Sequence, residues 1–125
     1  MMNPEVKAKW VAALRSGKYQ QASGTLNDEG RFCCLGVLCE ISGLGAWVEH
    51  NGDGLIPYET GKDKETDLAP HSVCDWAGFQ EGSNPQLRVP TVVIEEEREG
   101  LHEHNDAGKT FAEIADAIEA CAEAL

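Results

Sequence analysis

Two polar clusters hold the residue types that best suit ligand binding, and the first lies at residues 15–21. It contains Arg15, Lys18, Tyr19 and Gln21, and Arg15 and Lys18 form a basic stripe with Lys7 of the first expected helix. An arginine at a helix end, an aromatic ring and an amide can hold a phosphate, stack on a base and read its edge. The same residues are also typical of a helix stop followed by an exposed strand. Both interpretations stay open at this point.

The second cluster is the pair Asn105 and Asp106, which precedes the last expected helix. A short polar loop that opens onto a helix N-terminus suits an anion or a hydroxyl group. Carboxylate acceptors and an amide donor suit a ribose or a base edge. An ordinary Asx turn is the alternative. If the two clusters form one site, we expect Arg15 and Asn105 to line a single cleft.

Cys34 is the candidate nucleophile, because it is expected at the N-terminus of a buried helix, where the helix dipole lowers a thiol pKa. No hydrolase signature surrounds it, so we expect a structural cysteine. His102 and His104 are the candidate zinc ligands, with Cys33, Cys34 or Cys39 to complete the set. The close ligand pairs of structural zinc do not occur in the sequence, and we expect surface histidines in a polar loop. We expect no metal, no cofactor and no catalytic residue.

The elements that must position these residues follow from capping and periodicity. Asn3 and Pro4 begin a helix that ends near Gly17, and a capping box at Thr110 and Glu113 begins the last one. The first expected elements between them are a strand over 19–26 that turns at 27–30 and pairs with 31–33, and a buried helix over 34–41, for which a strand is the alternative. A small hairpin formed by 47–48 and 55–58, a helix from 70 to 77, a turn at 82–85 and a strand over 87–94 follow. The run 95–99 is interpreted as a solvated charge run. These elements predict one α+β domain over residues 1–125, with amphipathic terminal helices and a buried central helix packed with a small antiparallel sheet.

Charge and cysteine content limit the class of protein. The 125-residue chain has a net charge of −12; residues 63–125 carry four Lys or Arg against fifteen Asp or Glu. Broad binding of DNA or anionic membrane needs clustered cations, so we expect neither. Five cysteines in an unpaired pattern are typical of buried free thiols in a reducing cytoplasm. We expect Cys33, Cys34 and Cys39 to lie inside.

Three sequence blocks, 9–21, 32–39 and 105–116, resemble small accessory proteins encoded by tailed phages and prophages. That family implies no activity or catalytic residue. The resemblance implies a protein that counters host defence. This implication comes from the phage proteins that the chain resembles and not from the residues themselves.

Three functions follow as expectations. The first is a non-catalytic, oligomeric protein that sequesters a small nucleotide-like immune signal by means of Arg15, Lys18, Tyr19, Gln21, Asn105 and Asp106. The second is an acidic mimic of nucleic acid that binds a basic host protein through residues such as Glu95 and Glu97. The third is a hydrolase that uses Cys34.

Overall fold

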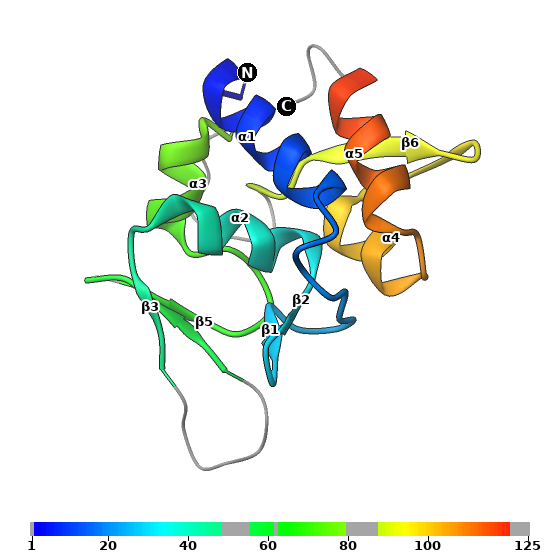
Figure 1. Cartoon of the computed structure of the whole chain (residues 1–125). Helices are drawn as coiled ribbons and strands as arrows, with labels where there is room; N and C mark the ends of the chain where they lie inside the picture. Colours follow the sequence, from blue (N-terminus) through cyan, green and yellow to red (C-terminus); the bar gives the residue numbers. More distant parts are fainter. Residues whose placement is uncertain (1, 49–55, 62, 80–87, 121–125) are drawn as a thin grey trace.

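The computed structural model describes residues 2–48, 56–61, 63–79 and 88–120. Its helices are α1 (Pro4–Arg15), α2 (Cys34–Ser42), α3 (His71–Ala77), α4 (Leu101–Asp106) and α5 (Phe111–Ala120). Its strands are β1 (Asn27–Asp28), β2 (Arg31–Phe32), β3 (Ala46–Trp47), β4 (Tyr58–Glu59), β5 (Lys64–Glu65), β6 (Thr91–Ile94) and β7 (Glu97–Gly100). The strands pair antiparallel as β1–β2, β3–β4–β5 and β6–β7. The chain is thus a single compact α+β domain, as predicted (Figure 1).

Both terminal helices begin at the predicted caps. The Asn3 side chain accepts a hydrogen bond from the Glu5 amide at 2.9 Å, with Pro4 at the first helical position. Thr110 and Glu113 form the predicted capping box, because each side chain accepts from the other residue's backbone amide. The two helices pack against each other along one side of the molecule (Figure 1). None of the helices in the described part of the chain is long and apolar enough to cross a membrane.

The predicted buried central helix is α2. Cys33 caps it, since its Sγ accepts from the Gly36 amide at 3.4 Å, and Gly43 ends it in the left-handed conformation with φ +65°. Gly36 marks a close approach: a Cβ there would lie 2.0 Å from the Leu26 carbonyl oxygen. The chain before β1 therefore packs directly on the helix backbone, which only glycine permits at this position.

Trp10 connects α1 to the core. Its ring is fully buried, its Nε1 donates to the Cys34 carbonyl at 2.9 Å, and its ring centroid lies 6.0 Å from that of Phe79. Other large buried apolar side chains come from every helix, from β4 and β6 and from the chain before β1; they include Leu14, Leu26, Leu35, Leu38, Tyr58, Val73, Val92, Leu101, Ile114 and Ile118. Cys33, Cys34, Cys39 and Cys74 are buried free thiols, which confirms the expectation for the first three; Cys121 lies outside the described residues.

The prediction of a strand over 19–26 was wrong. Its backbone meets β2 at an isolated bridge between Gln21 and Phe32, where the Ala22 amide donates to the Phe32 carbonyl at 2.8 Å and the Phe32 amide donates to the Gln20 carbonyl at 2.8 Å. The paired strand begins at Asn27, and the predicted turn closes a hairpin two residues long on each side. The hydrogen bonds of Leu26 explain the difference: its amide donates to the Thr66 carbonyl at 2.6 Å, so the chain before Asn27 pairs with the segment before α3 as well as with β2.

The predicted pairing of 47–48 with 55–58 appears as β3 with β4, and β5 adds a third strand that the sequence did not indicate. The turn expected within 51–54 and the one at 82–85 lie outside the described residues. The helix from 70 to 77 is confirmed as α3; Pro70 caps it, and Gly78 ends it with φ +82°.

The interpretation of 95–99 as a solvated charge run was wrong in part. Glu97 to Gly100 form β7, which pairs with β6. The strand predicted over 87–94 is thus confirmed only from Thr91, after Pro90, and residue 87 lies outside the described residues. Glu95 and Glu96 make the two-residue turn with φ values of +53° and +71°, a conformation that Asn and Gly favour. The tip of this hairpin extends beyond the helices (Figure 1).

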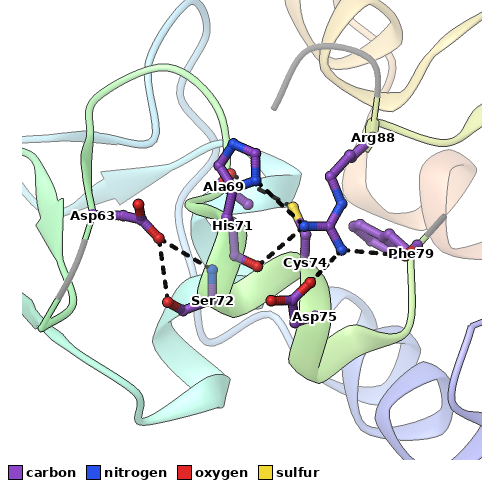
Figure 2. A network of polar contacts seen from close by, with 8 residues as sticks. All are labelled: Asp63, Ala69, His71, Ser72, Cys74, Asp75, Phe79 and Arg88. Atoms are coloured by element: carbon purple, nitrogen blue, oxygen red, sulfur yellow. Dashed lines mark hydrogen bonds and ion pairs between the residues drawn. The ribbon is translucent and has the colours of Figure 1, made fainter. Parts of the chain in front are cut away.

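A buried arginine fixes α3 to the chain that follows it (Figure 2). Arg88 donates to Asp75 at 2.6 Å, to the Phe79 carbonyl at 3.3 Å and to the His71 carbonyl at 3.4 Å. Its side chain is only 3% exposed, whereas that of Asp75 is 67% exposed. Because several acceptors share the buried guanidinium, we assign this network a structural role.

Candidate functional site

A groove of about 400 Å³ follows the outer face of α1. Its apolar lining consists of Pro4, Ala8, Val11 and Ala12, and its polar lining of Lys7, Arg15 and Glu119. Eight residues separate the two cations, which is about 12 Å along a helix axis. We call this site the α1 groove. An apolar floor between two cations suits a ligand with a flat apolar part and two anionic groups.

Arg15 is held at the edge of the α1 groove by two acids of α5. Its Nη2 donates to Asp116 at 2.6 Å and its Nη1 to Glu119 at 2.9 Å. Hydrogen bonds to Asp116 and then to Glu119 raise the pKa of the guanidinium. Because all three groups are exposed, these ion pairs contribute little to stability. A guanidinium has five N–H donors, so others remain for an anion.

Lys18 and Tyr19 follow α1 but do not line the α1 groove. The Lys18 Nζ lies 5.9 Å from the centroid of the Tyr19 ring. That ring meets Phe32 edge-on at 5.6 Å, and Phe32 in turn contacts Trp47 at 5.3 Å. The Tyr19 ring thus belongs to an aromatic row on the half-buried side of the β1–β2 hairpin, with a cation at its end.

The structure brings Gln21 and Asn105 together, but they bind each other and the backbone. Asn105 is 1% exposed, and its Oδ1 accepts from Gln21 at 3.0 Å and from the Cys34 amide at 3.1 Å. Its Nδ2 donates to the Ala22 carbonyl at 2.6 Å. Asn105 lies in the last turn of α4 and not in a loop. Arg15 and Asn105 therefore do not line one cleft within the described residues.

Asp106 is exposed and lies on a different cavity, of about 250 Å³. We call it the acidic pocket, and its lining residues are Gly24, Thr25, Cys33, Asp67, Leu68, His102 and Asp106. The Oδ1 of Asp106 accepts from the Gly24 amide at 2.7 Å. Two carboxylates would repel a phosphate, so this pocket does not suit the anionic part of a nucleotide.

The expectation of surface histidines in a polar loop was wrong, because residues 101–106 form α4. His104 is fully buried, and its Nε2 donates to the Val92 carbonyl at 2.8 Å, which ties α4 to β6. His102 lines the acidic pocket. Within the described residues, no group of three or more His, Cys, Asp or Glu side chains is placed to hold a metal ion.

Cys34 lies at the start of α2, as expected, but solvent does not reach it. Its Sγ contacts the Leu101 carbonyl at 3.5 Å, and burial raises its pKa well above the ordinary value. Burial also raises the pKa of Cys33 to about 11. Both thiols are therefore protonated at neutral pH, and a protonated thiol is a poor nucleophile.

Acidic side chains gather at the tip of the β6–β7 hairpin, where Glu95, Glu96 and Glu97 are exposed. Glu95 accepts from the Lys109 Nζ at 2.6 Å, and this hydrogen bond lowers the pKa of its carboxyl. The turn thus presents carboxylates at the end of a short two-stranded ribbon.

Sequence reasoning placed Lys7 and Arg15 on one basic stripe but missed the apolar floor between them. The spacing of Lys7, Val11 and Arg15 by four residues was the available signal, since such residues share a helix face. No signal of this kind connects Asp67 with Asp106, because they are distant in the chain and only the fold brings them together.

Comparison with known proteins gives one match. A family model described as Domain of unknown function (DUF8296) matches residues 2–122. No curated protein and no solved structure matches the chain.

Proposed function

The chain belongs to the family described as Domain of unknown function (DUF8296), and we propose that it is a non-catalytic binding protein that sequesters a nucleotide-type immune signal. The observation that carries the proposal is the α1 groove, where an apolar floor lies between Lys7 and Arg15. A base can pack on the alanine and valine side chains while phosphates meet the cations. Lys18 and Tyr19 extend this cationic end of α1.

Electrostatics support the choice of the α1 groove over the acidic pocket. On a protein with net charge −12, a phosphate is attracted only where cations gather locally. Arginine binds phosphate through paired N–H donors, and Arg15 is already oriented by Asp116 and Glu119. Gln21 and Asn105 serve the site indirectly, because they fix the segment that follows α1.

The proposal includes a phage origin and action in the host cytoplasm. The resemblance of three sequence blocks to tailed-phage proteins supports the origin, and the four free thiols of the described chain support a reducing compartment. We further propose a homo-oligomer, because two grooves that face one ligand would double the number of cations around its phosphates.

Isothermal titration against a panel of cyclic dinucleotides and cyclic ADP-ribose isomers tests the proposal. We expect one member to bind, and Arg15→Gln to weaken it at least about tenfold, as is typical for loss of a charge-assisted phosphate contact. Arg31→Gln is the matched control, since Arg31 is an exposed arginine paired with Asp28 outside the α1 groove. Flat heats with every member would reject the proposal.

A second variant tests the position of the ligand without changing charge. Ala12→Leu adds bulk to the floor of the α1 groove on an exposed helical residue, so we expect it to block binding. Ala112→Leu adds the same side chain to an exposed residue of α5 outside the groove and should leave affinity unchanged. Equal affinity of both variants would place the ligand elsewhere.

The hairpin tip favours a second candidate, an acidic mimic of nucleic acid that binds a basic host protein. The supporting observation is the turn that presents Glu95, Glu96 and Glu97 to solvent. Salt-sensitive co-purification of a basic protein is expected, and it should be lost when these three residues are changed to lysine. Retention by the lysine variant would reject this candidate. A hydrolase that uses Cys34 is not proposed, because that thiol is buried and protonated.

A further inference from the structure

Strand β6 has one edge that no other strand of the described chain covers, since it pairs with β7 alone. The Leu101 amide donates to the Pro90 carbonyl at 3.0 Å, so the hydrogen-bonded pairs of this ladder fall at every second residue counted from that pair. Thr91 and Val93 lie between those pairs. Their backbone N–H and C=O groups therefore point away from β7.

The outward backbone groups of Thr91 and Val93 have no hydrogen-bond partner in the part of the chain that the structure describes. Both side chains are exposed, and that of Val93 is 47% exposed, which is unusual for a large apolar residue of this protein. The opposite edge of the ribbon differs, because the Gly100 amide donates to Glu103 Oε1 at 3.1 Å. The free edge of β6 thus offers backbone donors and acceptors to an added strand.

The composition of β6 favours such pairing. Proteins usually protect a free strand edge with charged side chains, proline or a bulge. The four residues of β6, Thr91–Ile94, are all β-branched and uncharged, and their register with β7 contains no bulge. β7 carries three charged side chains instead. The ribbon runs out beyond the helices, so its end is open to a partner (Figure 1).

We propose that the free edge of β6 pairs antiparallel with the same edge of a second copy of this chain, which joins the two ribbons into one four-stranded sheet. When Val92 lies opposite the partner's Val92 on a two-fold axis, Thr91 of each copy lies opposite Val93 of the other. The outward groups then meet, and each such pair exchanges two hydrogen bonds. The edge is therefore complementary to itself, as a two-fold interface requires.

Electrostatics favour a second copy as the occupant of this edge. A chain with net charge −12 repels its own copies, so an interface between them must avoid charged side chains, and β6 has none. The acidic turns lie at opposite ends of the joined sheet, where Glu95 of one copy is six residues, or about 20 Å, from the partner's Glu95. That separation exceeds the Debye length of about 8 Å at physiological salt, so the two turns hardly repel each other.

A cavity of about 200 Å³ borders the same strand, and its lining residues are Val92, Val93, Arg98, Ala117 and Ala120. The two alanines belong to α5, and their small side chains leave space beside β6. Side chains of the partner's strand can occupy that space.

This inference deepens the homo-oligomer of the proposed function and rests on that part of it, but it does not depend on a nucleotide. Sedimentation velocity of the full chain over a range of concentrations tests it. Because an edge of four residues buries little area, we expect a dimer that dissociates on dilution. Val93→Lys puts a charge on the exposed edge and should weaken the dimer at least about tenfold. Leu44→Lys is the matched control, since Leu44 is a large apolar residue that is 43% exposed outside β6.

Hydrogen exchange of single amides, measured by NMR, locates the interface without any variant. We expect the Thr91 and Val93 amides to gain protection as the protein concentration rises. The Arg98 amide is the internal control, because Arg98 lies directly opposite Val93 and its amide points to the other edge of the ribbon. Its exchange should not change with concentration.

Three results would each overturn the proposal: equal association of Val93→Lys and Leu44→Lys, exchange at Thr91 and Val93 that does not depend on concentration, or a chain that stays monomeric. A monomer would leave the edge to a strand of a different protein. A monomer that still binds a cyclic nucleotide through Arg15 rejects the interface alone. A dimer with the expected exchange pattern but flat heats of titration supports the interface and rejects the nucleotide.

Discussion

Asn105 and Asp106 are neighbours with opposite roles at the scale of single residues. Asn105 uses both ends of its amide inside the protein, and it holds α4, the segment after α1 and the start of α2 in place. Asp106 is exposed and uses one carboxylate oxygen on the Gly24 amide. The sequence does not distinguish their roles. The difference is burial: the Asn105 amide is buried and structural, whereas the Asp106 carboxylate is exposed and available to a ligand.

Reciprocal isosteric substitutions test this assignment. Asn105→Asp removes the donor to the Ala22 carbonyl and buries a charge, so we expect the free energy of unfolding to fall by about 3 kcal/mol. Asp106→Asn keeps an oxygen that accepts from the Gly24 amide at the surface, so it should change the free energy of unfolding by less than about 0.5 kcal/mol. Urea denaturation measures both. Equal stability of the two variants would contradict the structural role of Asn105.

The buried thiol of Cys33 gives stability a pH dependence. Burial raises its pKa from the ordinary 9.0 to about 11, so the folded protein keeps a proton that the unfolded chain loses. Its contribution is complete below pH 9 and is lost as pH rises towards 11. We expect urea denaturation at stepped pH to show this fall, and Cys33→Ala to show a smaller one. Identical pH profiles would contradict the assigned burial.

Helix α2 depends, at the scale of elements, on a contact between its backbone and the chain before β1. A Cβ on Gly36 would meet the Leu26 carbonyl oxygen at 2.0 Å, and backbone cannot move aside easily. We expect Gly36→Ala to lower the free energy of unfolding by about 3 kcal/mol or more, as overpacking does. Gly61→Ala, with nothing within 4 Å of the added Cβ, is the control and should be tolerated. A harmless Gly36→Ala would disprove the close approach.

The elements that could be predicted are those with local signals. A helix end can be predicted from a single residue whose side chain caps the helix or whose backbone favours a left-handed turn. Such residues are Asn3, Gly43 and Thr110, and helices begin or end there in the structure. β7 and α4 could not be predicted, because their residues are strongly polar and their pairing partners lie in other elements. Glu97 pairs with Ile94, and His104 is buried by β6; such tertiary contacts override local preference.

The same reasoning explains how much of the site was accessible from sequence. The basic stripe on α1 follows from helical periodicity alone, so Arg15 could be chosen without a structure. The floor of the α1 groove depends on which face of α1 the neighbouring helices leave open. The Asn105 amide donates to the Ala22 carbonyl, which lies about eighty residues away in sequence. No local sequence pattern specifies such a distant partner.

At the scale of the whole molecule, charge is divided between two cavities of opposite character. The α1 groove has the cations Lys7 and Arg15 beside the single acid Glu119, whereas the acidic pocket has Asp67 and Asp106 and no described cation. A protein with net charge −12 repels nucleotides on average, so a nucleotide must be held by local cations and by apolar packing. We therefore expect the captured ligand to be small, and the stoichiometry to show more than one chain per complex.

Native mass spectrometry of the protein recovered from cells that produce an immune signal tests the central claim most directly. The account predicts an oligomer that carries the added mass of a nucleotide-type molecule, in the wild type and in Arg31→Gln, with that mass lost in Arg15→Gln. Recovery of ligand-free wild-type protein from such cells, or equal retention of the ligand by Arg15→Gln, would contradict it.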